Sequence, residues 1–340
     1  MFTRSIAFVS AMILLATPLV LAAGGSGYHV LITYKVGGAG KWDYLTMDSN
    51  ARRLYIARGT HVMVLDPDSG NRIGDIQNTP GVHGIALAPE LGLGFTSNGD
   101  DGTVSIFDSK TLTIKKKVRV GDNPGAILYD SVTKRVFTFN RRSQDSTAID
   151  ASTGRVLGTI KLDGAPDVAA SDDNGRIFVN IGKGQLVTLD PNKLEVKVRW
   201  PLAPCVVPRG LSMDRKNHRL FVGCDNNMMA VVDADTGRVL ETPEIGEDVD
   251  ATAFDADTGL AFASCADGSL TVVKEDPPDR FTIIDNVRTM QGARTMALDS
   301  ITHRVFLVTA QYGHPSDAKE DDERPNQLIP DSFVVLVVGQ

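Results

Sequence analysis

The sequence is poor in cysteine and in aromatic residues: its 340 residues include 3 cysteines, 2 tryptophans and 6% aromatics in all. The cysteines form no CxxCH motif, which excludes covalent attachment of a c-type haem. The 6 histidines form no HExxH motif and no GxSxG sequence is present, so neither a zincin metal site nor a nucleophile elbow is encoded. No catalytic motif of these kinds identifies a function.

Only the N-terminus carries a long apolar run. Residues 1–23 (MFTRSIAFVSAMILLATPLVLAA) combine one basic residue with an apolar stretch that ends in small residues, the pattern of a secretory signal peptide. A retained membrane anchor is the alternative, but the run is short for a bilayer span. We expect a periplasmic or secreted protein with no membrane span after cleavage.

The charge is negative, with 35 basic and 42 acidic residues giving a net −7, or −8 once the leader with its Arg4 is removed. This balance does not favour nucleic acid as a partner. The basic stretch at 115–119 is interpreted as protection of an exposed sheet edge.

Seven copies of one pattern, a strand, a polar turn and a second strand with an aromatic residue, dominate the chain. The residues that open the turn are Asp48, Pro89, Asp130, Asp172, Asp214, Asp255 and Asp299. The aromatic residues that follow them are Tyr55, Phe95, Phe137, Phe178, Phe221, Phe262 and Phe306. A period of about 42 residues is that of propeller blades, and stacked blades bury such side chains between them.

Each repeat continues with a third strand that usually ends on Asp, as in VVDADTG, and a fourth, more polar strand. The last repeat lacks its own fourth strand, which the segment at 28–38 can supply, so that the two ends of the chain close the ring. The sequence predicts an all-β fold, a seven-bladed propeller of four-stranded antiparallel blades. One domain spans 28–340, with an acidic, proline-containing loop inserted at 311–332.

The three cysteines allow at most one disulfide. Cys224 and Cys265 occupy equivalent positions in neighbouring blades, whose sheets lie about 10 Å apart, too far for a disulfide. Cys205 enters the blade that carries Cys224, so we predict a Cys205–Cys224 bond and a free Cys265; three reduced thiols are the alternative.

Candidate site residues come from the loops that converge at one end of a propeller channel. The entry to the first strand and the exit from the second strand supply these loops, and the predicted ligand-binding residues at this mouth are Asp43, Arg58, His83, Asn98, Asn140, Asp167, Arg209, Asp250 and Arg294. A solvated rim of ion pairs is the alternative interpretation.

The three aspartates and His83 could also hold Ca²⁺ or Mg²⁺. However, Arg209 and Arg294 in the same ring would repel a cation and can pair with the carboxylates instead. We therefore predict no metal and no cofactor.

The repeat unit, clearest in VVDADTGRVL and MALDSITHRVFLV, resembles the YVTN repeat of YncE-like β-propellers, from about Tyr28 to Gly339. Pro89 and Lys274 depart from the aspartates of the pattern. The resemblance implies an exported seven-bladed propeller in a family mostly without an assigned reaction. Similar repeats occur in surface-layer proteins, in the haem d1 domain of nitrite reductases and in lactonases.

Two functions follow as hypotheses. The first is a non-catalytic, monomeric scaffold that binds an envelope protein, a peptide or a small ligand at the channel mouth. The second is a lactonase-like or metal-assisted hydrolase at the same place, with Asp43, Asp167 or Asp250 as general base or metal ligand and Arg209 or Arg294 stabilising an oxyanion.

Overall fold

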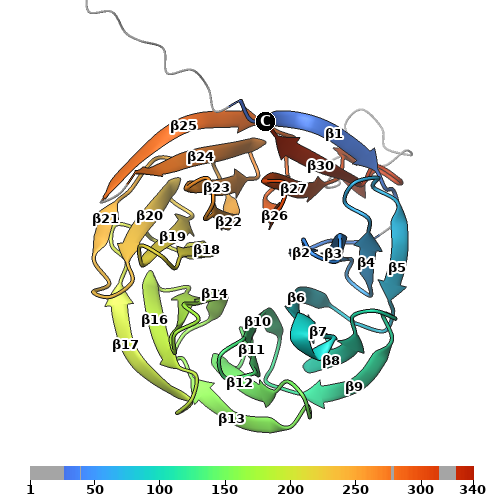
Figure 1. Cartoon of the computed structure of the whole chain (residues 1–340), viewed down its shortest axis with the longest axis vertical. Coiled ribbons are helices and arrows are strands. Elements are labelled where there is room, and N and C mark those ends of the chain that lie inside the picture. Colours follow the sequence, from blue (N-terminus) through green and yellow to red (C-terminus); the bar gives the residue numbers. More distant parts are fainter. Residues whose placement is uncertain (1–26, 39, 277–278, 314–326) are drawn as a thin grey trace, which may run out of the picture.

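Seven four-stranded antiparallel sheets are arranged as blades around a central axis (Figure 1). The computed structural model describes residues 27–38, 40–276, 279–313 and 327–340. The predicted signal peptide at 1–23 lies outside these residues. The all-β, seven-bladed architecture expected from the repeat is confirmed.

Within each blade the strands follow one another outward from the axis. Blade 1 contains β2 (Leu45–Asp48), β3 (Arg53–Ala57), β4 (Val62–Leu65) and β5 (Arg72–Ile76). Blade 2 contains β6 (Val82–Ala88), the 3-10 helix η1 (Pro89–Leu91), β7 (Leu93–Asn98), β8 (Thr103–Asp108) and β9 (Ile114–Arg119). Blade 3 contains β10 (Pro124–Asp130), β11 (Arg135–Asn140), β12 (Asp145–Asp150) and β13 (Val156–Lys161). Blade 4 contains β14 (Pro166–Ser171), β15 (Ile177–Ile181), β16 (Gln185–Asp190) and β17 (Glu195–Pro201).

The remaining blades follow the same plan. Blade 5 contains β18 (Pro208–Asp214), β19 (Arg219–Cys224), β20 (Met228–Asp233) and β21 (Val239–Glu241). Blade 6 contains β22 (Val249–Asp255), β23 (Leu260–Cys265), β24 (Ser269–Asp276) and β25 (Arg280–Arg288). Blade 7 contains β26 (Thr295–Asp299), β27 (Arg304–Thr309), β30 (Val334–Gly339) and β1 (His29–Lys35).

The two ends of the chain close the ring in blade 7. Strand β30 pairs with β27 on one side and with β1 on the other, with Thr33 opposite Leu336. The first described strand therefore supplies the outer strand of the last blade, as the sequence predicts. This pairing removes the open seam that a linear array of blades would leave.

The aspartate that recurs at the end of the third strand caps the turn that follows it. Asp233 accepts hydrogen bonds from the backbone N–H groups of Asp235 and Thr236 at 3.0 and 2.8 Å. Asp150 accepts one from Thr153 in the same way. The carboxylate satisfies N–H groups that the turn would otherwise leave without partners.

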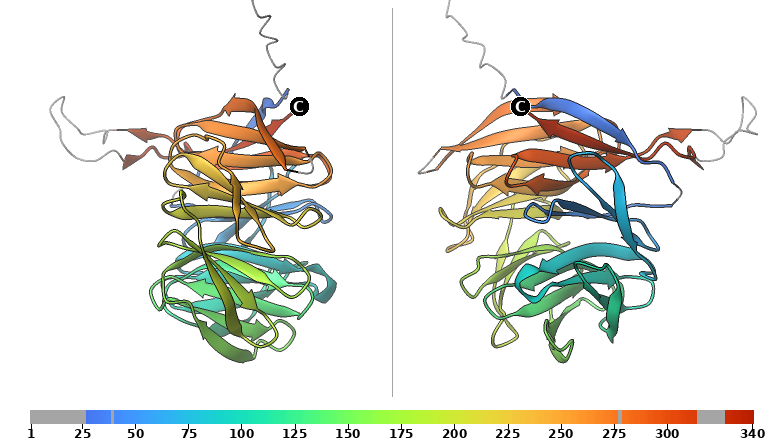
Figure 2. Two further views of the ribbon diagram at one scale, coloured as in Figure 1. Left: turned by 90° about the vertical axis from the view of Figure 1, so that its left-hand side faces the viewer. Right: turned by 45° about the vertical axis from the view of Figure 1, so that its right-hand side comes forward.

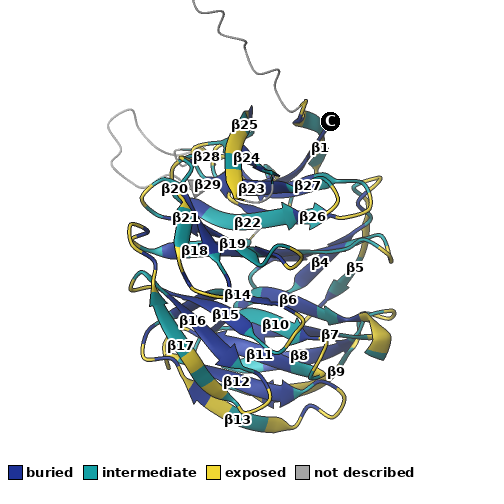
Figure 3. Cartoon of the chain, turned by 60° about the vertical axis from the view of Figure 1, so that its left-hand side comes forward, coloured by how far each residue is buried: buried dark blue, intermediate teal, exposed yellow. Residues whose placement is uncertain are grey.

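The seven repeat aromatics lie between blades, and each is at most 1% exposed. Each seam holds a cluster of apolar side chains from two neighbouring blades; for example, Phe262 of blade 6 packs with Leu307 of blade 7. Figure 3 shows the contrast between the buried middle strands, such as β12 and β16, and the more exposed outer strands such as β13 and β25. Apolar burial between blades is thus the main force that holds the ring together.

The predicted disulfide is present between Cys205, in the loop that enters blade 5, and Cys224, at the end of β19. Their Cα atoms are 5.5 Å apart. Cys265 is a free, buried thiol, and burial raises its pKa to about 12, so it is a poor nucleophile at neutral pH.

A two-stranded hairpin extends from blade 7 where the sequence predicts a loop at 311–332. Its strands are β28 (Tyr312–Gly313) and β29 (Gln327–Leu328), and Figure 2 shows them projecting from the body of the propeller. The part of the predicted loop at 314–326 lies outside the described residues.

Candidate functional site at the channel mouth

A cavity of about 210 Å³, here called the mouth cavity, lies at the end of the channel where the first strands begin. Segments of all seven blades contribute to its lining, which consists of Asp43, Tyr44, His83, Gly125, Ala126, Arg141, Asp167, Arg209, Asp248, Val249, Asp250 and Arg294. Six of the nine predicted site residues are therefore brought together: Asp43, His83, Asp167, Arg209, Asp250 and Arg294.

An interruption of strand pairing positions the charged side chains. The innermost strands β6, β10, β14, β18 and β22 each show a shift of register near their first residues. His83, Asp167, Arg209 and Asp250 lie within these interruptions. Irregularities of this kind release a residue from the ladder and redirect its side chain, so one repeated backbone feature turns four blades' residues toward the cavity.

Asp167 is the most buried of the cavity carboxylates, with its side chain 9% exposed. Its Oδ1 accepts a hydrogen bond of 3.1 Å from the hydroxyl of Tyr44. Its Oδ2 lies 3.5 Å from a guanidinium nitrogen of Arg141 and 3.5 Å from one of Arg209. Burial raises the pKa of Asp167, and the two arginines oppose that shift.

The arginines make their shorter contacts with other carboxylates. Arg209 binds Asp225 through two hydrogen bonds of 2.8 Å, a bidentate pair. Arg294 lies 2.8 Å from Asp248 and 3.3 Å from Asp250. Both arginines are thus held in place by aspartates, with looser contacts to the deeper carboxylates.

Asp250 is a cavity carboxyl whose pKa is raised toward neutral pH. Burial is the largest cause, and with the nearby carboxylates of Asp43 and Asp167 it raises the pKa of Asp250 to about 6, against the opposing effect of Arg294 and Arg209. Across the cavity, Asp43 forms a 2.5 Å contact with Nδ1 of His83. The cavity therefore contains a carboxylate that can change its charge near neutral pH.

The ion pairs of the mouth leave an excess of negative charge. Five carboxylates, Asp43, Asp167, Asp225, Asp248 and Asp250, stand against three guanidiniums, Arg141, Arg209 and Arg294. The difference is two negative charges when every carboxylate is ionised and His83 is neutral. The electrostatic environment therefore favours a cation over an anion.

The three other predicted residues do not line the mouth cavity. Asn98 and Asn140 are fully buried and donate to side chains of their own hairpins, Asn98 to Thr103 and Ser105 and Asn140 to Asp145 and Thr147. They hold the turn between the second and third strands of their blades.

Arg58, the third, is 2% exposed and lines a neighbouring hollow. Its guanidinium lies 3.6 Å above the ring of Phe333, and burial lowers its pKa to about 10. Its contacts lie within the protein, so its predicted role in ligand binding gains no support from this geometry.

Tyr44, Arg141 and Asp248 are the polar cavity residues that the sequence did not single out. Tyr44 adjoins the predicted Asp43, and Asp248 precedes Asp250 by two positions. Both could therefore have been predicted by including the neighbours of the aligned residues. Arg141 follows the end of a second strand, where the alignment placed asparagines in two blades. Burial and three nearby carboxylates raise the pKa of Tyr44 well above its ordinary value, so its hydroxyl remains a donor.

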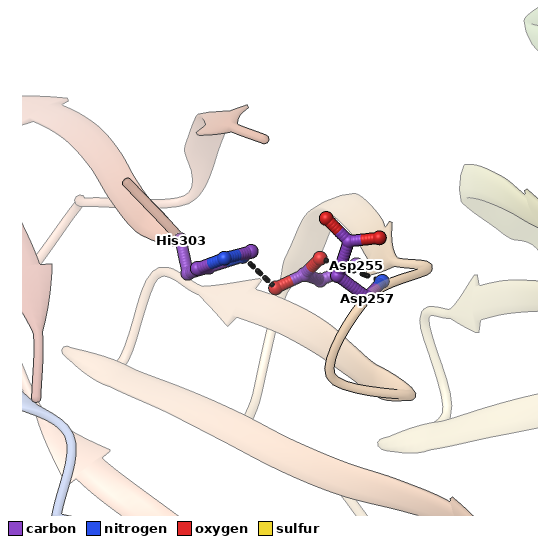
Figure 4. A group of neighbouring side chains, drawn as sticks. All are labelled: Asp255, Asp257 and His303. Atoms are coloured by element: carbon purple, nitrogen blue, oxygen red, sulfur yellow. Dashed lines mark hydrogen bonds and ion pairs between the residues drawn. The ribbon is translucent and has the colours of Figure 1, made fainter. Parts of the chain in front are cut away.

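The metal-binding alternative is not favoured by the positions of the carboxylates. In the described parts of the chain, the group of three potential ligands within 4.8 Å of one another is Asp255, Asp257 and His303, not the mouth aspartates. Figure 4 shows His303 directed at Asp255, with Nδ1 2.8 Å from Oδ2.

This group lies at the opposite end of the propeller and joins the turns of blades 6 and 7. Similar contacts join other blades: Ser171 donates to Asp130, and Arg52 contacts Asp299. The group is therefore one example of a contact between turn aspartates and the next blade, which explains it without a metal.

In the part of the chain that the structure describes, no helix is long and apolar enough to cross a membrane.

Comparisons with known proteins show the fold. No family model matches the chain, and no curated protein matches it. A solved structure titled Kuenenia stuttgartiensis hydrazine synthase is similar with a TM-score of 0.70 and 13% identity, covering 80% of this chain and 94% of that one.

A chain of a structure titled mitotic checkpoint complex is similar with a TM-score of 0.72 and 14% identity, covering 90% of this chain and 95% of that one. Identities this low carry information about fold and none about activity. The chain is a seven-bladed β-propeller closed by its own two ends.

Proposed function

We propose that this chain is an exported, monomeric propeller of the YVTN-repeat, YncE-like kind that binds a ligand at the mouth cavity without transforming it. The repeat motif supports the family, and the apolar leader at 1–23 supports export to the periplasm or the exterior. The ligand class includes an envelope protein, a peptide or a small polar molecule.

The observation that carries the proposal is the construction of the mouth cavity. All seven blades contribute to it, and strand irregularities direct four charged or polar side chains into it. Burying charged groups is costly unless they gain partners. Asp167 and Asp250 have only long contacts, of 3.3 to 3.5 Å, to their arginines. A ligand that donates further hydrogen bonds to these two carboxylates would explain why the cavity keeps them.

A hydrolase is the second candidate, because of Asp250. A carboxyl with a pKa of about 6 is matched to general-base catalysis near neutral pH. Arg294 could then stabilise an oxyanion, but it already contacts Asp248 and Asp250. To stabilise an oxyanion, Arg294 would have to leave these carboxylates. Ligand binding does not require this, so we favour the binding function.

The test is a thermal-shift screen of the purified mature chain against charged peptides, amines, carboxylates and divalent metals with and without chelator. It is run in parallel with a lactone and ester hydrolysis screen. The wild type is compared with Asp167→Asn and with Asp235→Asn, a control whose side chain is 53% exposed at the opposite end of the propeller.

We expect a ligand that shifts the melting temperature of wild type and Asp235→Asn but not of Asp167→Asn. Turnover that is lost in Asp250→Asn would replace the binding function with the hydrolase. A ligand that shifts all variants equally would place binding outside the mouth cavity.

A further inference from the structure

The mouth cavity continues into a longer groove along blade 7. A second cavity of about 430 Å³ shares Asp43, Asp248, Asp250 and Arg294 with the mouth cavity and adds Trp42 and Tyr312 among others. A third, of about 520 Å³, shares Ala266, Gly292 and Tyr312 with the second and adds Met290 and Ile329 among others. Because consecutive cavities share lining residues, they form one groove.

The chemistry of this groove changes along its length. Its inner end is the mouth cavity with its excess of carboxylates. Its middle is formed by Trp42 and Tyr312, whose ring centroids are 6.2 Å apart, here called the aromatic shelf. Its outer end is mostly apolar and reaches Ile329, next to the β28–β29 hairpin. One ligand lying along the groove would meet acidic, aromatic and apolar surfaces in that order.

Exposed apolar side chains mark the outer part as a contact surface. Tyr312 is 57% exposed and Ile329 is 40% exposed. The surface is nevertheless held in place. The Trp42 ring of the shelf also lies 5.4 Å from the ring of the buried Phe333, and at the outer end the N–H of Ile329 donates to the carbonyl of Gln311 at 2.8 Å. A held aromatic surface beside a charged cavity has the composition of an interaction hot spot.

Building on the ligand-binding function above, we propose that the groove binds an extended peptide segment of a partner protein. A lysine or arginine of that segment enters the mouth cavity, and adjacent apolar residues lie on the aromatic shelf and the outer end.

The choice of a basic residue follows from the contacts and the balance of the charged groups at the mouth. Arg209 is bidentate to Asp225, and Arg294 has Asp248 at 2.8 Å. Asp167 and Asp250 have guanidinium contacts of only 3.3 to 3.5 Å. A carboxylate offers about four acceptor positions, so these two can accept further donors. Among the described residues, Arg141 is the one cavity guanidinium whose shortest carboxylate contact is as long as 3.5 Å, so the preference for a basic residue rests on the excess of carboxylates over guanidiniums at the mouth.

The choice of a peptide follows from the extent and gradient of the groove. A free amine would fill the mouth cavity and leave the shelf and outer end uncovered. A basic side chain with apolar neighbours in an extended chain covers both, with the charged head fixing position and the apolar contacts adding buried area.

The experiment uses the two tryptophans of the mature chain. Trp42 forms the shelf, and Trp200 lies in the outer strand β17 of blade 4. In a Trp200→Phe background the remaining fluorescence reports on the groove, and calorimetry on the unaltered chain checks the same affinities. The parent probes are acetyl-Lys-Leu-Leu-amide and the peptide of reversed sequence. Each is compared with versions in which Gln, Glu or norleucine replaces Lys. Acetyl-Lys-Ser-Ser-amide tests the contribution of the apolar residues.

We expect one order of the Lys peptide to bind at least about tenfold more tightly than its Gln, norleucine and Glu counterparts, the usual scale for a charge-assisted contact. It should also bind more tightly than acetyl-Lys-Ser-Ser-amide. Asp167→Asn should remove the preference for Lys over Gln, and Asp235→Asn should keep it. Because that preference is read from the peptides, a poorly folding variant would not prevent the test.

Equal binding of Lys and Gln peptides, or tighter binding of the Glu peptide, would overturn the basic-residue assignment. Equal binding of the Leu and Ser peptides would overturn the role of the shelf. If no peptide binds but the thermal-shift screen finds a ligand, the peptide-binding inference is refuted and the ligand-binding function stands. If no peptide binds and the screen finds no ligand, both proposals are refuted.

Discussion

The hydroxyl of Tyr44, at the entry to blade 1, donates a hydrogen bond of 3.1 Å to Asp167 of blade 4. The two residues come from blades that are not neighbours in the ring (Figure 1). Contacts between successive blades build the propeller, whereas this one spans its mouth. It links the floor of the cavity to its most buried carboxylate.

Replacing Tyr44 with Phe should therefore destabilise the protein. The change removes a donor from a buried carboxylate, which costs about 1–3 kcal/mol. Thermal or urea unfolding at pH 7.5 measures the loss. Tyr129→Phe is the matched control, because its hydroxyl also donates to a carboxylate, Glu90, but at the surface. Equal effects of the two substitutions would show that the contact across the mouth has no special weight.

Asp250→Asn should stabilise the protein at neutral pH. The folded pKa of about 6 lies above the ordinary 3.8, so ionising Asp250 costs the folded state, and stability falls as pH rises between these values. The cost is fully present above pH 6 and amounts to at most about 3 kcal/mol. Arg294 retains Asp248 at 2.8 Å in the variant, so no guanidinium is stranded.

Melting temperatures from pH 4 to pH 8 check this sign. The variant should exceed wild type at pH 7.5 and converge with it near pH 4, while Asp235→Asn shows no such gain. A loss of stability at pH 7.5 would mean that the contact with Arg294 outweighs the burial of the charge. If a basic peptide binds here, its affinity for wild type should weaken below pH 6 as Asp250 becomes neutral.

Reduction of the Cys205–Cys224 bond should lower the melting temperature by several degrees. The bond closes a loop with a sequence separation of 19 residues, for which the loss is about 3 kcal/mol. Scanning calorimetry with and without reductant measures it. The Cys205→Ser, Cys224→Ser double variant should melt at the lower temperature and ignore reductant. An identical wild-type curve under both conditions would show that the bond does not stabilise the native fold.

Gly70→Ala should be more damaging than Gly92→Ala, although both glycines have positive φ, +72° and +63°. A Cβ on Gly70 would come 2.3 Å from the Tyr34 ring of the closing strand β1, whereas one on Gly92 would meet nothing within 4 Å. We expect about 1–2 kcal/mol for Gly92→Ala from backbone strain and about 2–4 kcal/mol for Gly70→Ala from strain plus overpacking. Urea unfolding of both variants measures the two losses in free energy of unfolding. Equal losses would show that β1 can shift to accommodate the added methyl group.

The blade number, the strand order and the closure of the ring were all predictable from the sequence. Tyr55 and Phe306 recur at fixed positions because each blade must bury the same surface against its neighbour. Cys205 and Cys224 could be paired because the repeat places them beside each other in one blade. Local, periodic constraints of this kind are written into any repeat.

The candidate site was predictable only in part. The repeat alignment located Asp167, Arg209 and Asp250 at one mouth because they share a position in the blade. It placed Asn98 and Asn140 there as well, since alignment gives the height of a residue along a strand and not the direction of its side chain. A proline opens three of the five strand irregularities, including the one at Asp167, whereas the one at His83 begins at Val82, so the sequence marks them only in part.

The fold follows from the sequence alone, because seven similar segments with buried aromatics cover their apolar faces when they pack against one another in a closed ring. The pairing of the charged groups at the mouth, in contrast, is set by the tertiary structure. The hydrogen bond from Tyr44 to Asp167 and the contact between Arg209 and Asp167 both join side chains from different blades, far apart in the sequence. Such pairings arise from the geometry of the closed ring, and no local pattern encodes them.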